Sequence, residues 1–198
     1  SRGVEPSERW SGTRNYWVSG AFRDEGLILF GINSSENLDQ NGLPTRELDD
    51  QTMADLFAEV CALKRDTPGA LVVGLMHHRL DASEEGIVNA TSFKRNISAA
   101  TGSIVLLTGH MHEESSTLTQ ETNKPSILHV GSSTYMLTAS KRPEDSLRGF
   151  NLIEFERSEG VVTGIRVDTY AIVGNQLRPL SSTPYRRDQS GVILRSTL

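Results

Sequence analysis

Three short segments that are mostly apolar constrain the fold of this chain more than any other feature. They span Leu71–Met76, Ile104–Thr108 and residues 126–130. Runs of this length without polar alternation are typical of strands buried on both faces. Two stretches with helical spacing of apolar residues lie before and between these runs, so helices alternate with buried strands. The pattern predicts an α/β fold with a mixed β-sheet and two main helices, in a single domain over residues 1–198.

Both predicted helices carry start or stop signals. The first begins after Asp49, a good N-cap residue, and ends before Pro68-Gly69. Its apolar residues recur on one face, at Met53, Leu56, Phe57, Val60 and Leu63. The second is predicted over residues 84–100, with Gly102 as the stop. Each helix is therefore expected to cover a sheet with one apolar face.

Further strands are predicted at both ends of the chain. Residues 16–22 and Leu27–Ile32 are β-rich and flank an Asp/Gly-bearing turn, which is typical of a hairpin. From Phe150 onward, residues 151–156 and 161–172 indicate a closing β-meander. The last stretch, residues 178–198, is polar apart from a short apolar run, and we interpret it as closing strands and a tail.

Composition excludes several classes of function. The net charge is −5, and no Lys/Arg excess offers a surface for nucleic acid. No stretch approaches the ~18 apolar residues of a membrane-spanning helix, so no membrane association is expected. Cys61 is the single cysteine, so no disulfide forms within the chain, and we expect it to be buried in the first helix. This cysteine usage fits a reducing compartment, and we predict a cytoplasmic location.

Four of the five histidines fall in two clusters, each directly after a buried strand. His77-His78 follows the strand that ends at Met76, and His110-Met-His112 follows the strand that ends at Thr108. In open α/β sheets, ligands bind at the edge where strands have their carboxyl ends. Neutral imidazole is a common ligand of zinc, manganese or iron. The two clusters therefore predict a metal site at that edge.

At this point the sequence resembles a known family. Leu107-Thr-Gly-His-Met-His112 is similar to the GHxH motif of calcineurin-like metallophosphoesterases, and residues 72–78 resemble the preceding HH motif. Residues 28–34, 127–132 and 151–155 resemble three further strands of that family, in the same order. The resemblance runs from about Trp10 to about Phe155. It implies the C-terminal half of a layered αββα sandwich.

The resemblance also implies roles for individual residues. His77 and His110 would bind one divalent metal ion (manganese, iron or zinc), and His112 would bind a second. His78 would face the substrate or form a hydrogen bond behind the ligands. Arg79 stands where the family usually has proline, and it would either contact phosphate or close a loop. Together they imply a dinuclear-metal phosphoesterase that cleaves a phosphate ester with a metal-activated hydroxide.

The chain departs from the family pattern in its acidic ligands. The family carries Asp-x-His, Gly-Asp and Gly-Asn-His motifs in its N-terminal half, and no Asp-x-His, Gly-Asp or Asn-His occurs in these 198 residues. The metal site of this chain alone is therefore expected to be incomplete. We expect an N-terminal half that lies upstream of Ser1 on the same product or on a partner chain.

Two other functions stay open on the sequence alone. The chain could be a catalytically incomplete phosphoesterase-like module that serves as a binding or regulatory domain. It could also be a cupin-like enzyme with a single metal on His110 and His112, although Glu113 and Glu114 follow too closely and helices intervene. His129 lies inside a strand, where a packed imidazole is expected rather than a metal ligand.

Overall fold

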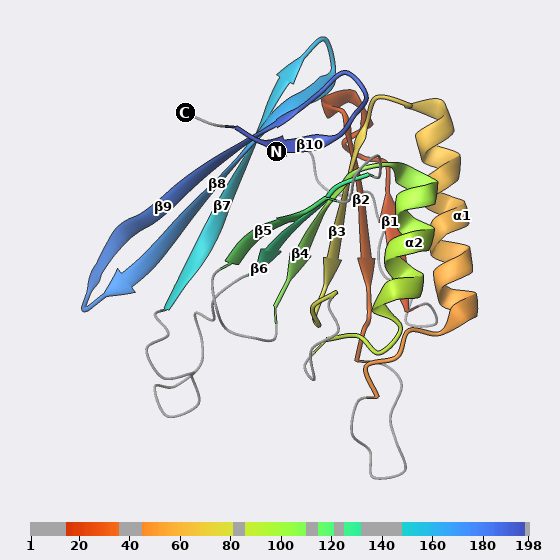
Figure 1. Ribbon diagram of the computed structural model, residues 1–198, viewed down its shortest axis with the longest axis horizontal. Helices are drawn as coiled ribbons and strands as arrows, with labels where there is room; N and C mark the ends of the chain where they lie inside the picture. Colours follow the sequence, from red (N-terminus) through yellow and green to blue (C-terminus); the bar gives the residue numbers. More distant parts are fainter. Residues whose placement is uncertain are drawn as a thin grey trace.

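The computed structural model describes residues 15–35, 45–80, 86–109, 115–120, 125–131 and 148–196. Within these residues the chain forms three layers: two helices, a six-stranded sheet and a four-stranded sheet (Figure 1). The six-stranded sheet is the middle layer, with the helices on one face and the second sheet on the other. The predicted mixed α/β fold with two helices is confirmed.

The first sheet has the strand order β1-β2-β3-β4-β6-β5. Its four central strands, β2, β3, β4 and β6, are parallel, and the edge strands β1 and β5 run antiparallel to their neighbours. The predicted hairpin and the three buried strands are confirmed, whereas β5 was not predicted. The strands are β1 Tyr16–Ser19, β2 Leu27–Ile32, β3 Leu71–Met76, β4 Ile104–Thr108, β5 Ser115–Thr119 and β6 Ile127–Gly131.

The first helix, α1, spans Asp50–Asp66, as predicted. The Asp49 carboxylate accepts a hydrogen bond from the Thr52 amide at 2.7 Å, which satisfies one of the free N–H groups of the first turn. The predicted apolar residues on its inner face are buried, with Leu63 partly so. Cys61 is half-buried rather than buried, and its Sγ lies 3.6 Å from the Ala100 carbonyl oxygen of α2.

The second helix, α2, spans Ala90–Thr101 and starts later than the predicted range of residues 84–100. Residues 86–89 are not helical. The Asn89 side chain accepts from the Leu48 amide at 3.1 Å and donates to the Leu48 carbonyl at 2.8 Å. This paired contact holds the approach to the helix against the segment before α1. A long-range contact therefore overrides the helical pattern of the sequence.

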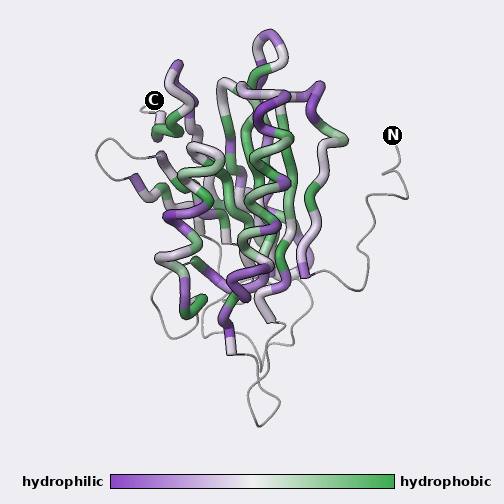
Figure 2. The backbone as a smooth tube through the Cα atoms, turned by 90° about the vertical axis from the view of Figure 1, so that its right-hand side faces the viewer, coloured by the Kyte–Doolittle hydropathy of each residue, from purple (hydrophilic) through white to green (hydrophobic). Residues whose placement is uncertain are grey.

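The two helices and the sheet enclose a large apolar core. Phe57 of α1 and Phe93 of α2 meet edge to face, with ring centroids 5.3 Å apart. Opposite them, every second residue of β2 and β3 points to the helices, including Ile28, Phe30 and Val72. Viewed from the helix side, Figure 2 shows the hydrophobic strands behind the two helices. Each such buried side chain contributes about 1.5–3 kcal/mol to folding.

The second sheet is a meander of three long strands closed by a short one. It has the order β10-β9-β8-β7, with all neighbours antiparallel. The predicted meander is confirmed, and the last stretch, interpreted as closing strands and a tail, contains most of β9 and all of β10. The strands are β7 Arg148–Ser158, β8 Val161–Val173, β9 Gln176–Arg187 and β10 Ile193–Arg195.

The two sheets meet closely at the amino ends of the parallel strands. Leu71 of β3 is fully buried there with Val162, Ile165 and Tyr185 of the second sheet. Hydrogen bonds join the same region, among them the one that the Ile193 amide donates to Ser126 Oγ at 2.8 Å. Away from this end the sheets diverge (Figure 1). In the described part of the chain, no helix is long and apolar enough to cross a membrane.

Candidate metal centre

The carboxyl ends of four parallel strands lie in one row. Ile32 of β2, Met76 of β3, Thr108 of β4 and Gly131 of β6 are register neighbours across the sheet. The residues that follow these positions therefore leave the sheet at one common edge. The two histidine clusters follow Met76 and, after one glycine, Thr108, so the strands that precede them are adjacent.

Contacts between His77 and Gly109 join the loops after β3 and β4. The Gly109 amide donates to the His77 carbonyl oxygen at 3.1 Å. A Cβ atom added to Gly109 would lie 3.6 Å from His77 Nδ1, so the imidazole of His77 lies beside the backbone that leads to His110. The His77 side chain is exposed. His110 and His112 lie outside the described residues.

His78 is buried and bonded to the loop after β2. Its side chain is only 3% exposed, and the neighbouring Ser34 is 2% exposed. Ser34 Oγ lies 3.0 Å from His78 Nδ1, and the His78 amide donates to the same Oγ at 3.1 Å. One serine thus holds both the ring and the backbone of His78. The rings of His77 and His78 meet edge to face, with centroids 4.9 Å apart.

Ser34 Oγ therefore fixes the position of the His78 ring through two contacts, one to the ring and one to the amide. The exposed ring of His77 packs edge to face on this fixed neighbour.

The backbone after the histidine pair is also held in place. The Ile87 amide donates to the Arg79 carbonyl oxygen at 3.0 Å, and Arg79 and Gly86 form an isolated β-bridge. Leu80 is 1% exposed and belongs to the helix-side core. Arg79 itself is half-buried. The loop is therefore anchored on both sides of Arg79.

The other candidate residues are placed as follows. His129 is in β6 beside Leu106, on the helix side of the sheet and short of its carboxyl edge. Glu113 and Glu114 lie outside the described residues. Among the residues that the structure describes, no group of three or more His, Cys, Asp or Glu side chains could hold a metal ion. Two of the three predicted ligands are not among those residues.

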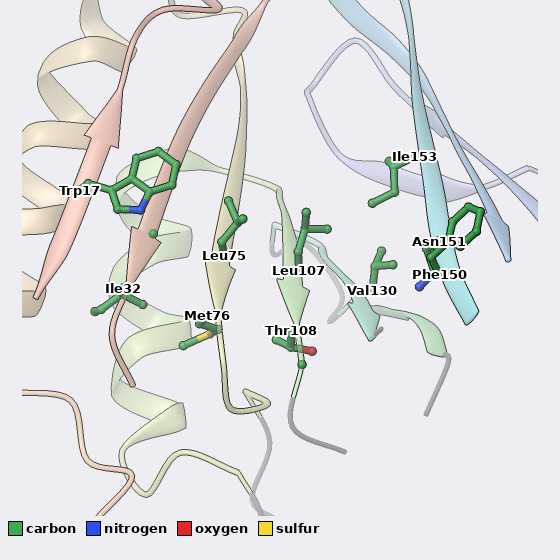
Figure 3. A pocket seen from close by; sticks show the side chains of 12 residues that line it. Trp17, Ile32, Leu75, Met76, Leu107, Thr108, Val130, Phe150, Asn151 and Ile153 are labelled. Carbon is green, nitrogen blue, oxygen red and sulfur yellow. The ribbon is translucent and has the colours of Figure 1, made fainter. Parts of the chain in front are cut away.

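An apolar cleft of about 510 Å³ opens next to this edge, between the two sheets. Its floor is formed by β1, β2, β3, β4 and β6, and its wall by β7 (Figure 3). It reaches Thr108 and Gly109, so it adjoins the predicted metal position. The lining residues are Trp17, Gly31, Ile32, Leu75, Met76, Leu107, Thr108, Gly109, Val130, Phe150, Asn151 and Ile153.

Sequence reasoning did not find this cleft. Trp17 of the hairpin lies against Gly31 on the cleft side. Asn151 was considered only as part of a strand. Its Nδ2 donates to the Gly131 carbonyl at 2.7 Å, and its Oδ1 accepts from Thr169 at 2.8 Å. Asn151 therefore links β7 to β6 of the other sheet. A polar asparagine between the apolar Phe150 and Leu152 is the one feature of the sequence that could have indicated this link.

No protein-family model matches the chain, and a search of curated proteins returned no match. The assignment of a function therefore depends on the geometry of the sheet edge. That geometry joins an exposed imidazole, the glycine that precedes a second histidine motif, and a buried serine–histidine pair.

Proposed function

We propose that this chain supplies the histidine ligands of a dinuclear-metal phosphoesterase with an αββα sandwich of the calcineurin-like type. The contact between His77 and Gly109 carries the proposal. It joins the two histidine motifs, which are 33 positions apart in the sequence when counted from His77 to His110 (110 − 77). The contact continues the parallel register of Met76 with Thr108, so the residues that follow β3 and β4 lie side by side.

The residues present fit divalent metal ions as ligands. His77, His110 and His112 would hold the two ions, with imidazole nitrogens that suit manganese, iron or zinc. When bound, such ions polarise the phosphate ester and supply a nucleophile at neutral pH. Ligand histidines are commonly oriented by hydrogen-bonded groups behind them. The buried pair of Ser34 and His78 would orient His77 through the edge-to-face contact of the two imidazole rings.

The residues of this chain would act on the substrate mainly by positioning. His78 packs against His77 and is closed off from solvent, so we assign it an orienting role rather than contact with the ester. Arg79 follows the pair on an anchored backbone, and its guanidinium would bind a phosphate oxygen. The substrate would enter along the open end of the sandwich, where His77 is exposed.

The proposal requires carboxylates that these residues do not provide. The acidic motifs of the family do not occur in the sequence. Another polypeptide segment, part of the same protein or of a partner chain, must therefore contribute them. We refer to it as the acidic-ligand segment. The complete protein is the chain together with this segment.

The test is metal content and hydrolysis of an aryl phosphate by the complete protein. His77→Ala should remove bound metal and lower kcat/KM by more than the roughly 10–100-fold that loss of an outer-shell partner costs. His129→Ala is the matched control, because it removes an imidazole from the helix side of the same sheet, and it should keep both properties. Equal metal content and activity in the His77→Ala variant would refute the proposal.

A second measurement addresses the isolated chain. Residues 1–198 without the acidic-ligand segment should bind metal weakly and hydrolyse the aryl phosphate little. Turnover at ordinary enzyme rates, about 1–10³ per second, would show that the chain needs no further ligands.

A further inference from the structure

A second cavity, of about 570 Å³, lies beside α2 on the helix side of the first sheet. It is larger than the cleft between the sheets, and its volume is in the range that holds a small organic ligand. One wall is a face of α2, and the floor is the end of β5 and the start of β6. The lining residues are Thr91, Lys94, Arg95, Ser98, Ala99, Thr119, Pro125 and Ile127.

The cavity lies where the helical layer ends. α1 lies against β1 and β2, and α2 lies beside α1, whereas β5 is at the opposite end of the strand order from β1. Ile127 of β6 pairs with Thr119 of β5, and Ile127 belongs to the helix-side core, so both side chains point to the same side as the helices. Among the described residues, the two helices thus stop short of the edge strand, and the space beside α2 stays open.

The α2 wall of the cavity is a polar face of the helix. Its four polar residues are Thr91, Lys94, Arg95 and Ser98. They follow the spacing i, i+3, i+4 and i+7, which places them along one side of a helix. Thr119 adds a third hydroxyl group from the floor. The cavity is therefore lined by two positive charges and three hydroxyl groups.

The packing and capping of α2 do not explain its two cations. Within the part of the chain that the structure describes, Lys94 and Arg95 form no hydrogen bond or ion pair. α2 contains no Asp or Glu, whereas α1 contains four. Neither cation is in the last turn of α2, where free carbonyl groups favour a positive charge. Both charges are therefore available to a ligand.

The lining determines the chemistry of a fitting ligand. The described lining contains no carboxylate, so an anionic group beside Lys94 and Arg95 would form charge-assisted hydrogen bonds without repulsion from the walls. The rest of the lining is mostly apolar and suits an apolar body. A nucleic acid strand does not fit, because two cations in a chain of net charge −5 do not balance a run of phosphates.

We propose that the cavity beside α2 binds a small organic anion, with its carboxylate or phosphate group at Lys94 and Arg95. Its apolar body would lie against Ala99, Pro125 and Ile127. The inference does not depend on the proposed function. Ile127 is the first residue of β6, whereas the histidine motifs follow the carboxyl ends of the strands.

The experiment titrates three probes into the full 198-residue chain and follows backbone amide shifts by NMR. The anionic probes are 1-naphthoate and 1-naphthylphosphonate, which has no ester bond to cleave. We expect at least one of them to shift amides of α2 and residues 126–127, with a Kd of about 1 mM or lower for a ligand of this size. The neutral analogue 1-naphthalenemethanol should bind roughly tenfold more weakly. The tighter of the two anionic probes identifies the anionic group.

Variants separate the cavity from general surface charge. Lys94→Gln and Arg95→Gln should each weaken binding of the anionic probes roughly tenfold. Arg65→Gln, which removes an exposed arginine from α1, is the matched control and should bind normally. Ala99→Phe keeps both charges but places a ring in the cavity from an exposed position, and it should abolish binding of all three probes.

The inference is wrong if neither anionic probe shifts the amides of α2, or if the neutral analogue binds as tightly. It is also wrong if Ala99→Phe binds normally, because the anion would then be held by charge on an open surface. If Ala99→Phe does not fold, the two glutamine variants still decide, and normal binding by both would overturn the inference.

Discussion

The two ends of the space between the sheets differ in almost every physical respect. At the closed end, near the amino ends of the parallel strands, Leu71 is fully buried and the Arg187 guanidinium donates to the Gly69 carbonyl at 2.6 Å. At the open end, Leu75 of the same strand is exposed in a cleft and His77 follows on the sheet edge. One strand, β3, therefore contributes to a packed core at one end and to a candidate site at the other.

This difference separates stability from function along a single strand. The closed end joins the two sheets without help from other polypeptide, through apolar contacts and hydrogen bonds. The open end keeps an apolar surface and the side chain of His77 exposed, at a cost in burial. A protein that placed its site at the closed end would have to open its core to admit substrate.

The largest predicted effect is a difference in unfolding free energy between two variants, each with one leucine of β3 shortened to alanine, at the closed end or at the open end. Leu71→Ala should lower the free energy of unfolding by about 2–5 kcal/mol, because it leaves a cavity in a packed core. Leu75→Ala removes the same atoms from the same face of the same strand, but at an exposed position. It should cost about 1 kcal/mol or less. Urea unfolding of both variants measures the difference, and equal losses would mean that the cleft is closed in solution.

A second comparison uses two glycines on neighbouring strands and opposite faces. A Cβ at Gly74 would lie 2.3 Å from Phe30 Cζ and 2.8 Å from Leu106 Cδ1, inside the helix-side core. A Cβ at Gly31 would lie 2.2 Å from Trp17 Nε1, but Trp17 borders the cleft.

Gly74→Ala should therefore cost about 1–3 kcal/mol, as overpacking of an enclosed core does. Gly31→Ala should cost less, because the indole can move into the cleft. The change in Trp17 fluorescence on Gly31→Ala reports that movement, with Trp10 replaced by Phe in both samples. A larger stability loss for Gly31→Ala than for Gly74→Ala would contradict an open cleft.

Two buried serines give a third comparison, in which the stability effects match and the functional effects differ. Ser126 at the closed end accepts from the Ile193 amide, and Ser34 at the open end holds His78. Either change to alanine leaves buried polar groups without a partner and should cost about 1–3 kcal/mol. Only Ser34→Ala should also weaken metal binding by the complete protein, by roughly 10–100-fold. Isothermal titration with Mn²⁺ separates the two, and an equal loss of metal affinity in Ser126→Ala would remove the orienting role of Ser34.

The pattern of apolar residues in the sequence predicted the strands of the parallel part of the first sheet. Continuous apolar runs predicted β3 and β4, and residues 126–130 predicted β6 to within one residue. The strand of β5, Ser-Ser-Thr-Leu-Thr, was not predicted because only one of its residues is strongly apolar. The predicted start of α2 was wrong, because the contact of Asn89 with Leu48 joins segments that are far apart in the sequence and is not visible in the local pattern.

The candidate site likewise has features that the sequence could predict and features that it could not. Placement of His77 after a buried strand could be predicted, because parallel strands share an edge and apolar runs mark where strands end. The hydrogen bonds between Ser34 and His78 could not, since they join residues 44 positions apart. The cleft was equally hidden, because alternation along β3 makes Leu71 and Leu75 equivalent in sequence. Only the divergence of the two sheets distinguishes them.

The smallest predicted effect tests electrostatics at the closed end. Lys64 lies at the end of α1, where its ammonium donates to the Pro68 carbonyl at 2.7 Å and also to the Ala70 carbonyl. Burial, with a smaller contribution from the charge of Arg187, lowers the pKa of Lys64 from 10.5 to about 8. In the unfolded chain this lysine returns to its ordinary pKa. Between pH 8 and 10.5 the unfolded state therefore binds more protons than the folded state, so the contribution of Lys64 to stability rises with pH across this window.

Urea unfolding of the unaltered chain and of Lys64→Met between pH 7 and 10.5 measures this contribution. The difference in unfolding free energy should shift in favour of the unaltered chain as the pH rises through about 8, by a modest amount because the side chain is only partly buried. Lys94→Met removes a lysine from α2 and controls for the general loss of a positive charge. A difference that stays constant or falls with pH would mean that Lys64 is as well solvated as a surface lysine. The closed end would then be less tightly packed around the loop before β3 than its contacts indicate, and the contrast with the open end would be weaker.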